Sequence, residues 1–157
     1  MNSDDLIRQL KLTPLPGEGG YFRRTHAGEN DATGRAGFSV IYYLLNREQS
    51  RSRLHFLPIA ETYHFYLGDP VQMLILEAGK PGRELILGQD VMAGQQVQMQ
   101  VPANCWHGSR LCPGGDFALF GTTMTPGFMD KDFKLANAKS LQNQFPQFAA
   151  EIAKLTG

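Results

Sequence analysis

The chain has 157 residues, of which 42% are hydrophobic, and its 15 lysines and arginines balance its 15 aspartates and glutamates. This length favours a single domain over residues 1–157, and a neutral chain has no long-range field to collect nucleic acid or an anionic membrane surface. No apolar run approaches the ~20 residues of a membrane-spanning helix, and the start MNSDD does not resemble a signal peptide. Two cysteines are too few for a disulfide framework. We therefore expect a cytoplasmic protein with free thiols.

Helical signals stand only at the two ends of the chain. Ser3 can cap a short helix over about residues 4–10, with Leu6, Ile7 and Leu10 on one face. Runs typical of strands then follow at 20–25, 38–45, 52–57, 61–67, 71–77, 96–101, 106–111 and 117–124. The tail predicts two short helices, over 138–145 and 147–155, separated by Pro146.

The long strand-rich centre determines the expected fold class. Residues 38–45 are apolar, aromatic and β-branched, which suits a strand buried on both faces. Closing such strands into a barrel, or packing them as two sheets, removes exposed strand edges. We therefore expect an all-β protein, a barrel or jelly roll with short N- and C-terminal helices.

Two histidines and a glutamate are the strongest candidates for chemistry. His55, Glu61 and His107 stand in or beside separate predicted strands, and neighbouring antiparallel strands can bring such residues together. Two histidines with one carboxylate form the donor set of non-haem Fe(II) sites. The alternative is that the three are polar groups of a ligand cleft without metal, and spacing alone leaves both interpretations open.

The alternation of side chains across a strand sorts two further candidates. If Glu61 faces inward, Tyr63 does too and can act in catalysis, whereas His64 faces the other way unless a β-bulge reverses it. Cys105 shares the predicted face of His107, either as a thiol in the ligand pocket or as a small buried core residue.

Arginines supply candidate anion-binding groups. Arg53 shares the predicted face of His55, and can either clamp a carboxylate or phosphate or pair internally with Glu61. Arg23 and Glu18, near the start of the chain, can reach a neighbouring subunit or line the mouth of the pocket.

Two short motifs resemble those of the cupins, which are small jelly-roll barrels. Residues 53–68 read R-x-H-x5-E-x6-G, close to the first cupin motif H-x-H-x(3-4)-E-x6-G, and residues 94–107 read G-x7-P-x-N-x2-H, close to the second. A narrower similarity, to the Cupin_5 branch, covers nearly the whole chain. It rests on PGEGGYFR (16–23), IYYLL (41–45), ETYHFYLGDP (61–70) and TPGF with DF (125–128 and 132–133).

The chain departs from the motifs at several positions. Arg53 occupies the position of one metal-binding histidine, Tyr63 replaces a usual tryptophan, and Leu111 stands where the second motif has asparagine. The resemblance implies a cupin-type double-stranded β-helix, likened to deoxy-sugar nucleotide epimerases (RmlC-like), and a homodimer. It also implies a divalent transition metal (Fe, Mn, Ni or Zn), which we expect to be weakly held because the cationic Arg53 would share its cavity.

Two functions follow from these residues. The first is an enzyme acting on a small polar or anionic, sugar-like substrate, by metal-assisted or His/Tyr acid–base chemistry. The second is a non-catalytic binding or sensing module that kept the pocket and lost the metal. The candidate catalytic residues are His55, Glu61, His107 and Tyr63, the metal ligands are the first three, and the other ligand-binding candidates are Arg53, Arg23, His64 and Cys105.

Overall fold

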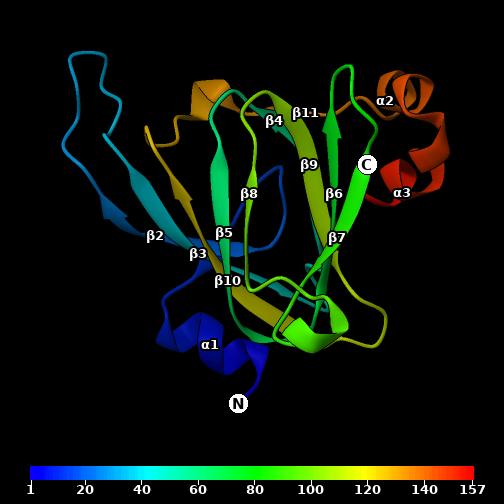
Figure 1. Cartoon of the computed structure of the whole chain (residues 1–157). Coiled ribbons are helices and arrows are strands. Elements are labelled where there is room, and N and C mark those ends of the chain that lie inside the picture. The colour runs from blue at the N-terminus through cyan, green and yellow to red at the C-terminus, as the bar shows by residue number, and fades with distance from the viewer.

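Two antiparallel sheets form the centre of the protein in the computed structural model, which describes all 157 residues (Figure 1). The first sheet has the order β1 (Thr13–Pro14), β2 (Tyr21–Ala27), β3 (Ser39–Asn46), β10 (Phe117–Met124), β5 (Glu61–Gly68) and β8 (Gln98–Val101). The second has the order β11 (Lys134–Leu135), β4 (Arg51–Leu57), β9 (Cys105–Leu111), β6 (Val71–Glu77) and β7 (Arg83–Leu87). Because strands distant in sequence alternate within each sheet, the cupin motifs in β4, β5 and β9 are divided between the two sheets.

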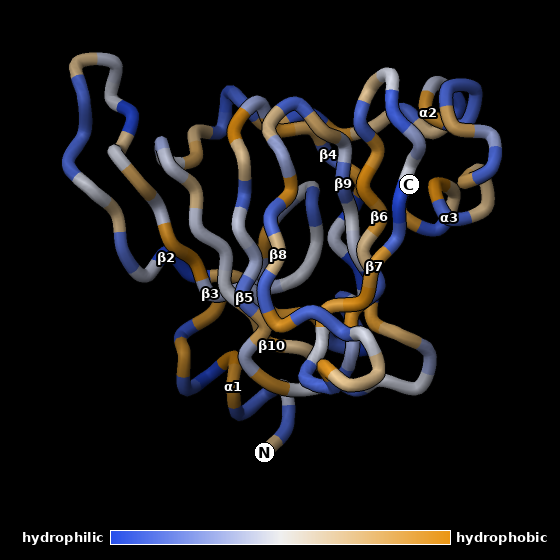
Figure 2. Tube along the Cα trace, in the orientation of Figure 1, coloured by the Kyte–Doolittle hydropathy of each residue, from blue (hydrophilic) through white to orange (hydrophobic).

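The main core lies between the sheets. Tyr43, Tyr63 and Phe120 of the first sheet pack in one buried cluster with Met73 and Ile75 of the second. Fully burying a side chain of this size stabilises the fold by about 1.5–3 kcal/mol. Figure 2 shows hydrophobic residues concentrated along β6 and mostly hydrophilic ones in the long loop between β2 and β3. The expected all-β double-sheet architecture is confirmed.

Helices cover the outer faces of both sheets. Helix α1 (Ser3–Gln9) packs Leu6 against Leu44 and Leu119 of the first sheet. Helices α2 (Ala138–Gln144) and α3 (Ala149–Lys154) bury their apolar side chains on the outer face of the second sheet, against Leu54, Leu74 and Leu76. Short 3₁₀ segments are η1 (Val91–Ala93), η2 (Asp130–Asp132) and η3 (Pro146–Phe148). None of the helices is long and apolar enough to cross a membrane.

Three local details differ from the sequence prediction. Asn2, not Ser3, caps α1, because its side chain accepts a hydrogen bond of 2.9 Å from the main-chain N–H of Asp5. Phe38 lies before β3 and is exposed, so burial on both faces begins only within the strand. Strand β7 (Arg83–Leu87) was not predicted, since its exposed first half carries charged residues.

Candidate functional site

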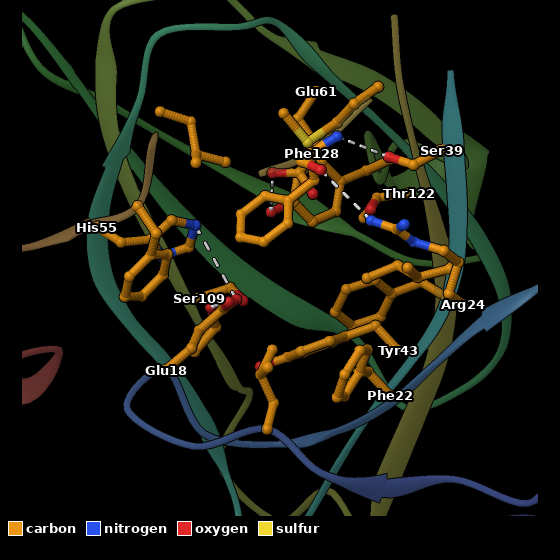
Figure 3. A pocket seen from close by; sticks show the side chains of 18 of the residues that line it. Glu18, Phe22, Arg24, Ser39, Tyr43, His55, Glu61, Ser109, Thr122 and Phe128 are labelled. Carbon is orange, nitrogen blue, oxygen red and sulfur yellow. Dashed lines mark hydrogen bonds and ion pairs between the residues drawn. The ribbon is translucent and has the colours of Figure 1, made fainter. Parts of the chain in front are cut away.

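A cavity of about 320 Å³ lies between the sheets, and half of its lining residues are hydrophobic. Phe22 and Ile41 of the first sheet, with Phe128 and Phe133 of the segment after β10, form an apolar wall. Figure 3 shows two of them, Phe22 and Phe128. The volume is at the lower end of the range for small-molecule pockets. The site therefore suits a small ligand with a substantial apolar part.

His55, Glu61 and His107 lie together, as the motif spacing predicts. All three are buried, and one potential ligand atom from each lies within 4.8 Å of the others. His55 of β4 stands directly opposite His107 of β9, with ring centroids 4.2 Å apart, while Glu61 comes from β5 of the other sheet. His55 and Glu61 line the cavity, whereas His107 is not among the lining residues and contacts Glu61.

The carboxylate of Glu61 is held by two hydrogen bonds. Oε2 lies 3.0 Å from Nε2 of His107 and accepts a bond of 3.2 Å from the Tyr63 hydroxyl. Burial alone raises the pKa of Glu61, but the hydrogen bond from His107 and the electrostatic effect of the two neighbouring imidazoles outweigh it and hold the pKa below its usual value. Glu61 is therefore ionised at neutral pH.

His55 presents a free lone pair to the cavity. A carbonyl oxygen can only accept, so the 2.7 Å contact between Nδ1 and the main-chain oxygen of Arg53 places the ring proton on Nδ1. Burial lowers the pKa of His55, so the ring is neutral near pH 7 and its Nε2 is an available donor to a metal. A backbone acceptor of this kind fixes the orientation of ligating histidines in many metal sites.

Glu18, which the sequence left at either the mouth of the pocket or a neighbouring subunit, lines the cavity beside His55. It comes from the loop between β1 and β2, accepts a hydrogen bond of 2.6 Å from Ser52 at Oε1, and has that oxygen 3.9 Å from Nε2 of His55. Burial raises the pKa of the Glu18 carboxyl. Only its place in the PGEGGYFR segment singled it out in the sequence.

Arg53 lies outside the cavity, which corrects its predicted face. The register between β4 and β9 shifts between Ser52 and His55, so a bulge turns both of these residues inward. Simple alternation, which grouped Arg53 with His55, therefore fails in this strand.

The guanidinium of Arg53 serves the structure of the loop instead. It donates bonds of 3.1 Å to the main-chain oxygens of Gly17 and Gly157. Of the two alternatives for Arg53, the internal pairing with Glu61 is therefore wrong, and its place outside the cavity also removes it as a clamp for a bound anion. The electrostatic reason for weak metal binding is removed with it.

His64 also points away from the cavity. Its ring nitrogens lie 3.1 Å from Nε2 of Gln98 and 3.3 Å from Oγ1 of Thr123. The alternation in β5 is regular at this end, so Glu61 and Tyr63 face inward and His64 faces outward. The structure thus places His64 on the outer face, not among ligand-binding residues.

Cys105 and Arg23 do not line the cavity either. Cys105 is fully buried in the core between the sheets, where burial raises the pKa of its thiol. The Arg23 guanidinium lies 5.6 Å from the centroid of the Tyr42 ring, outside the cavity. Its neighbour Arg24 lines the cavity instead, since strand alternation turns it inward.

An ion pair fastens the segment that closes one side of the cavity. Arg35, in the loop after β2, bonds to Asp132 at 2.6 Å and to the main-chain oxygen of Gly127 at 2.8 Å. This segment carries Phe133, which stacks on the ring of His55 with centroids 5.1 Å apart. The ion pair therefore helps to hold an aromatic wall beside the histidine.

We expect Asp132→Asn to destabilise the protein by about 1–2 kcal/mol at pH 7 and much less in acid. The hydrogen bond from Arg35 lowers the pKa of Asp132. A lowered pKa stabilises the fold above the unfolded value, about 3.9, and the contribution is lost as the pH falls through the folded value. Thermal melts near pH 7 and pH 3 measure this, with Asp116→Asn of the exposed Arg47–Asp116 pair as control. An equal loss at both pH values would contradict the assignment.

The comparisons with known proteins identify the family. The family model described as Cupin_5, cupin superfamily (DUF985), matches residues 4–136. The chain belongs to the Cupin_5 family. The predicted family is thus confirmed, and no curated protein matches this cupin.

Solved structures agree with this assignment. This Cupin_5 chain is similar to a Shewanella oneidensis protein (31% identity, TM-score 0.91, 100% of this chain and 98% of that one). It is also similar to a hypothetical protein from Leishmania major (27% identity, TM-score 0.88, 99% of each chain). Oxalate decarboxylase from Bacillus subtilis shares the fold at 14% identity and TM-score 0.58, over 94% of this chain and 38% of that one. These neighbours confirm the cupin-type fold.

Proposed function

We propose that the cavity of this cupin binds one divalent transition metal ion through His55, Glu61 and His107, and that the ion takes part in a reaction of a small molecule. The observation that carries this proposal is the convergence of three buried donors from three strands beside the cavity between the sheets. Oxalate decarboxylase from Bacillus subtilis, which shares only the fold, has Mn(II) centres.

The residues fit a metal ion on chemical grounds. Two imidazoles and one carboxylate suit Fe, Mn, Ni or Zn. The neutral His55, with Nδ1–H bonded to a backbone oxygen, already has the orientation of a ligand. The Nδ1 of His107 is buried without a hydrogen-bond partner, so Glu61 is the only hydrogen-bond partner of this ring. To bind an ion through Nε2, the ring would give up that hydrogen bond and carry its proton on Nδ1.

The lining residues support a ligand with an apolar body and one anionic group. Phe22, Ile41 and Phe128 form apolar wall, and Arg24 is the only lysine or arginine among the lining residues. The Arg24 guanidinium donates one long bond, of 3.4 Å, to the main-chain oxygen of Phe128, so further N–H groups remain for a carboxylate or phosphate. A cavity in which half of the lining residues are hydrophobic agrees poorly with a free sugar.

The chain's own residues would then orient the ligand and control protons near it. When bound, a divalent ion supplies Lewis acidity that polarises an oxygen of the ligand. Burial raises the pKa of Tyr63 well above its usual value, so Tyr63 keeps its proton and donates a hydrogen bond. Tyr63 therefore holds Glu61 in place and is a poor general base.

A metal titration tests the proposal. After removal of metal with a chelator, the chain is expected to bind one ion per chain by isothermal titration calorimetry, with Ni(II) bound more tightly than Mn(II). His55→Ala should lose this binding. The matched control, His64→Ala, removes a histidine on the outer face and should bind as the wild type does. Absence of binding by the wild type would contradict the proposal.

A second candidate function is a metal-free binding module. The observation that favours it is the bonding of Glu61 by both His107 and Tyr63, which satisfies the carboxylate without an ion. In that case the cavity would bind an apolar carboxylate with equal affinity before and after chelation. Homodimer assembly and cytoplasmic location stay predictions in either case.

A further inference from the structure

Glu18 lies outside both cupin motifs, but hydrogen bonds fasten its loop to the strand that carries His55. The main-chain oxygen of Glu18 accepts a bond of 2.8 Å from the main-chain N–H of Arg53. The Tyr43 hydroxyl donates a bond of 2.5 Å to the oxygen of Gly19. The position of Glu18 beside His55 is therefore built into the fold.

The carboxylate of Glu18 has no strong cationic partner. Its side chain is 16% exposed, its Oε1 accepts one bond from Ser52, and no lysine or arginine lies within ion-pair distance. Burying a charged group costs free energy unless another charge or several hydrogen bonds compensate. Glu18 thus lacks the compensation that a purely structural carboxylate would need.

The separation between Glu18 and His55 is close to the distance that two bonds to one metal ion span. Oε1 of Glu18 and Nε2 of neutral His55 are both acceptors, and they face each other at 3.9 Å. Transition metals bind such oxygen and nitrogen atoms at about 2.1 Å, so two bonds to one ion span at most about 4.2 Å. At the tetrahedral angle two such bonds hold their donor atoms about 3.4 Å apart. Glu18 lies outside the set of three whose ligand atoms are within 4.8 Å of one another, so binding one shared ion requires its side chain to move toward His55 and Glu61.

We propose that Glu18 is a fourth ligand of the metal centre formed by His55, Glu61 and His107. This inference rests on the proposed metal binding and adds a carboxylate from a segment outside the motifs. Two carboxylates and two neutral imidazoles balance the charge of a divalent cation. Arg53 stands where the first cupin motif has a metal-binding histidine, and Glu18 then supplies the fourth donor in place of that histidine.

The test compares metal affinity across matched variants, with Co(II) and Mn(II) as probes. Glu18→Gln preserves an oxygen acceptor for Ser52 and removes the charge, and we expect its affinity to fall about ten-fold or more. Glu18→Asp keeps the charge, but its side chain is one methylene shorter and cannot reach the ion. We therefore expect the metal affinity of Glu18→Asp to fall as well. The visible spectrum of bound Co(II), which reports coordination geometry, should change in both variants.

Asp130→Asn is the control, because Asp130 also lines the cavity but has no hydrogen bond or ion pair with either histidine. We expect wild-type affinity and an unchanged Co(II) spectrum for it. Unchanged binding in Glu18→Gln, or an equal loss in Asp130→Asn, would overturn the role of Glu18 as a ligand. Failure of the wild type to bind metal would overturn the proposed function itself. A thermal melt of each variant shows whether it is folded. If Glu18→Gln does not fold, the metal affinity of Glu18→Asp decides whether Glu18 is a ligand.

Discussion

Glu61→Gln is expected to lower metal affinity at least about 100-fold while changing the free energy of unfolding by less than about 1 kcal/mol. The charge at Glu61 is buried, and its low pKa shows that it is present at neutral pH. Glutamine has the same shape and can still accept hydrogen bonds from His107 and Tyr63. Removing the charge also removes its desolvation cost, which offsets the weaker hydrogen bonds.

Calorimetric titration and a thermal melt of Glu61→Gln measure the two effects. Glu84→Gln, which makes the same substitution on the exposed half of β7, is the control and should alter neither. An internal Arg53–Glu61 pair would have predicted a loss of roughly 3–5 kcal/mol, but Arg53 bonds elsewhere. A loss of that size with unchanged metal affinity would show that Glu61 has a structural role only.

Gly20→Ala is expected to destabilise the protein by about 2–5 kcal/mol. Gly20 has φ of 73°, a region that L-residues rarely adopt, and an added Cβ would lie 2.5 Å from the Tyr43 hydroxyl oxygen. Relief of this contact requires movement of the loop that carries Glu18. We therefore expect weaker metal binding as well as a lower melting temperature.

Gly34→Ala separates the cost of the positive φ from the cost of the contact with Tyr43. Gly34 has a similar φ of 83°, but its added Cβ would meet no atom within 4 Å. Its cost should be only the backbone strain, about 1–2 kcal/mol, with metal affinity unchanged. Chemical denaturation of both variants measures the difference, and equal losses would exclude the steric effect of Tyr43.

The regular part of the site could be predicted from sequence because strand alternation is a local property. In β5 the pattern continues without interruption across residues 61–64, so Glu61 and Tyr63 face inward and His64 outward. The two cupin motifs likewise placed His55 and His107 on neighbouring strands, where the register puts them opposite each other.

Composition and periodicity by themselves indicated the all-β class and the terminal helices, while the resemblance of the motifs to those of the cupins pointed to the family and to the grouping of His55, Glu61 and His107. Tertiary structure alone decided that Arg53 leaves the cavity and that Glu18 enters it. A bulge in β4 moves the phase of alternation by one residue, and no local pattern marks where it occurs. The Glu18 loop is fixed by hydrogen bonds to residues more than twenty positions away, and such long-range contacts exist only once the sheets have packed.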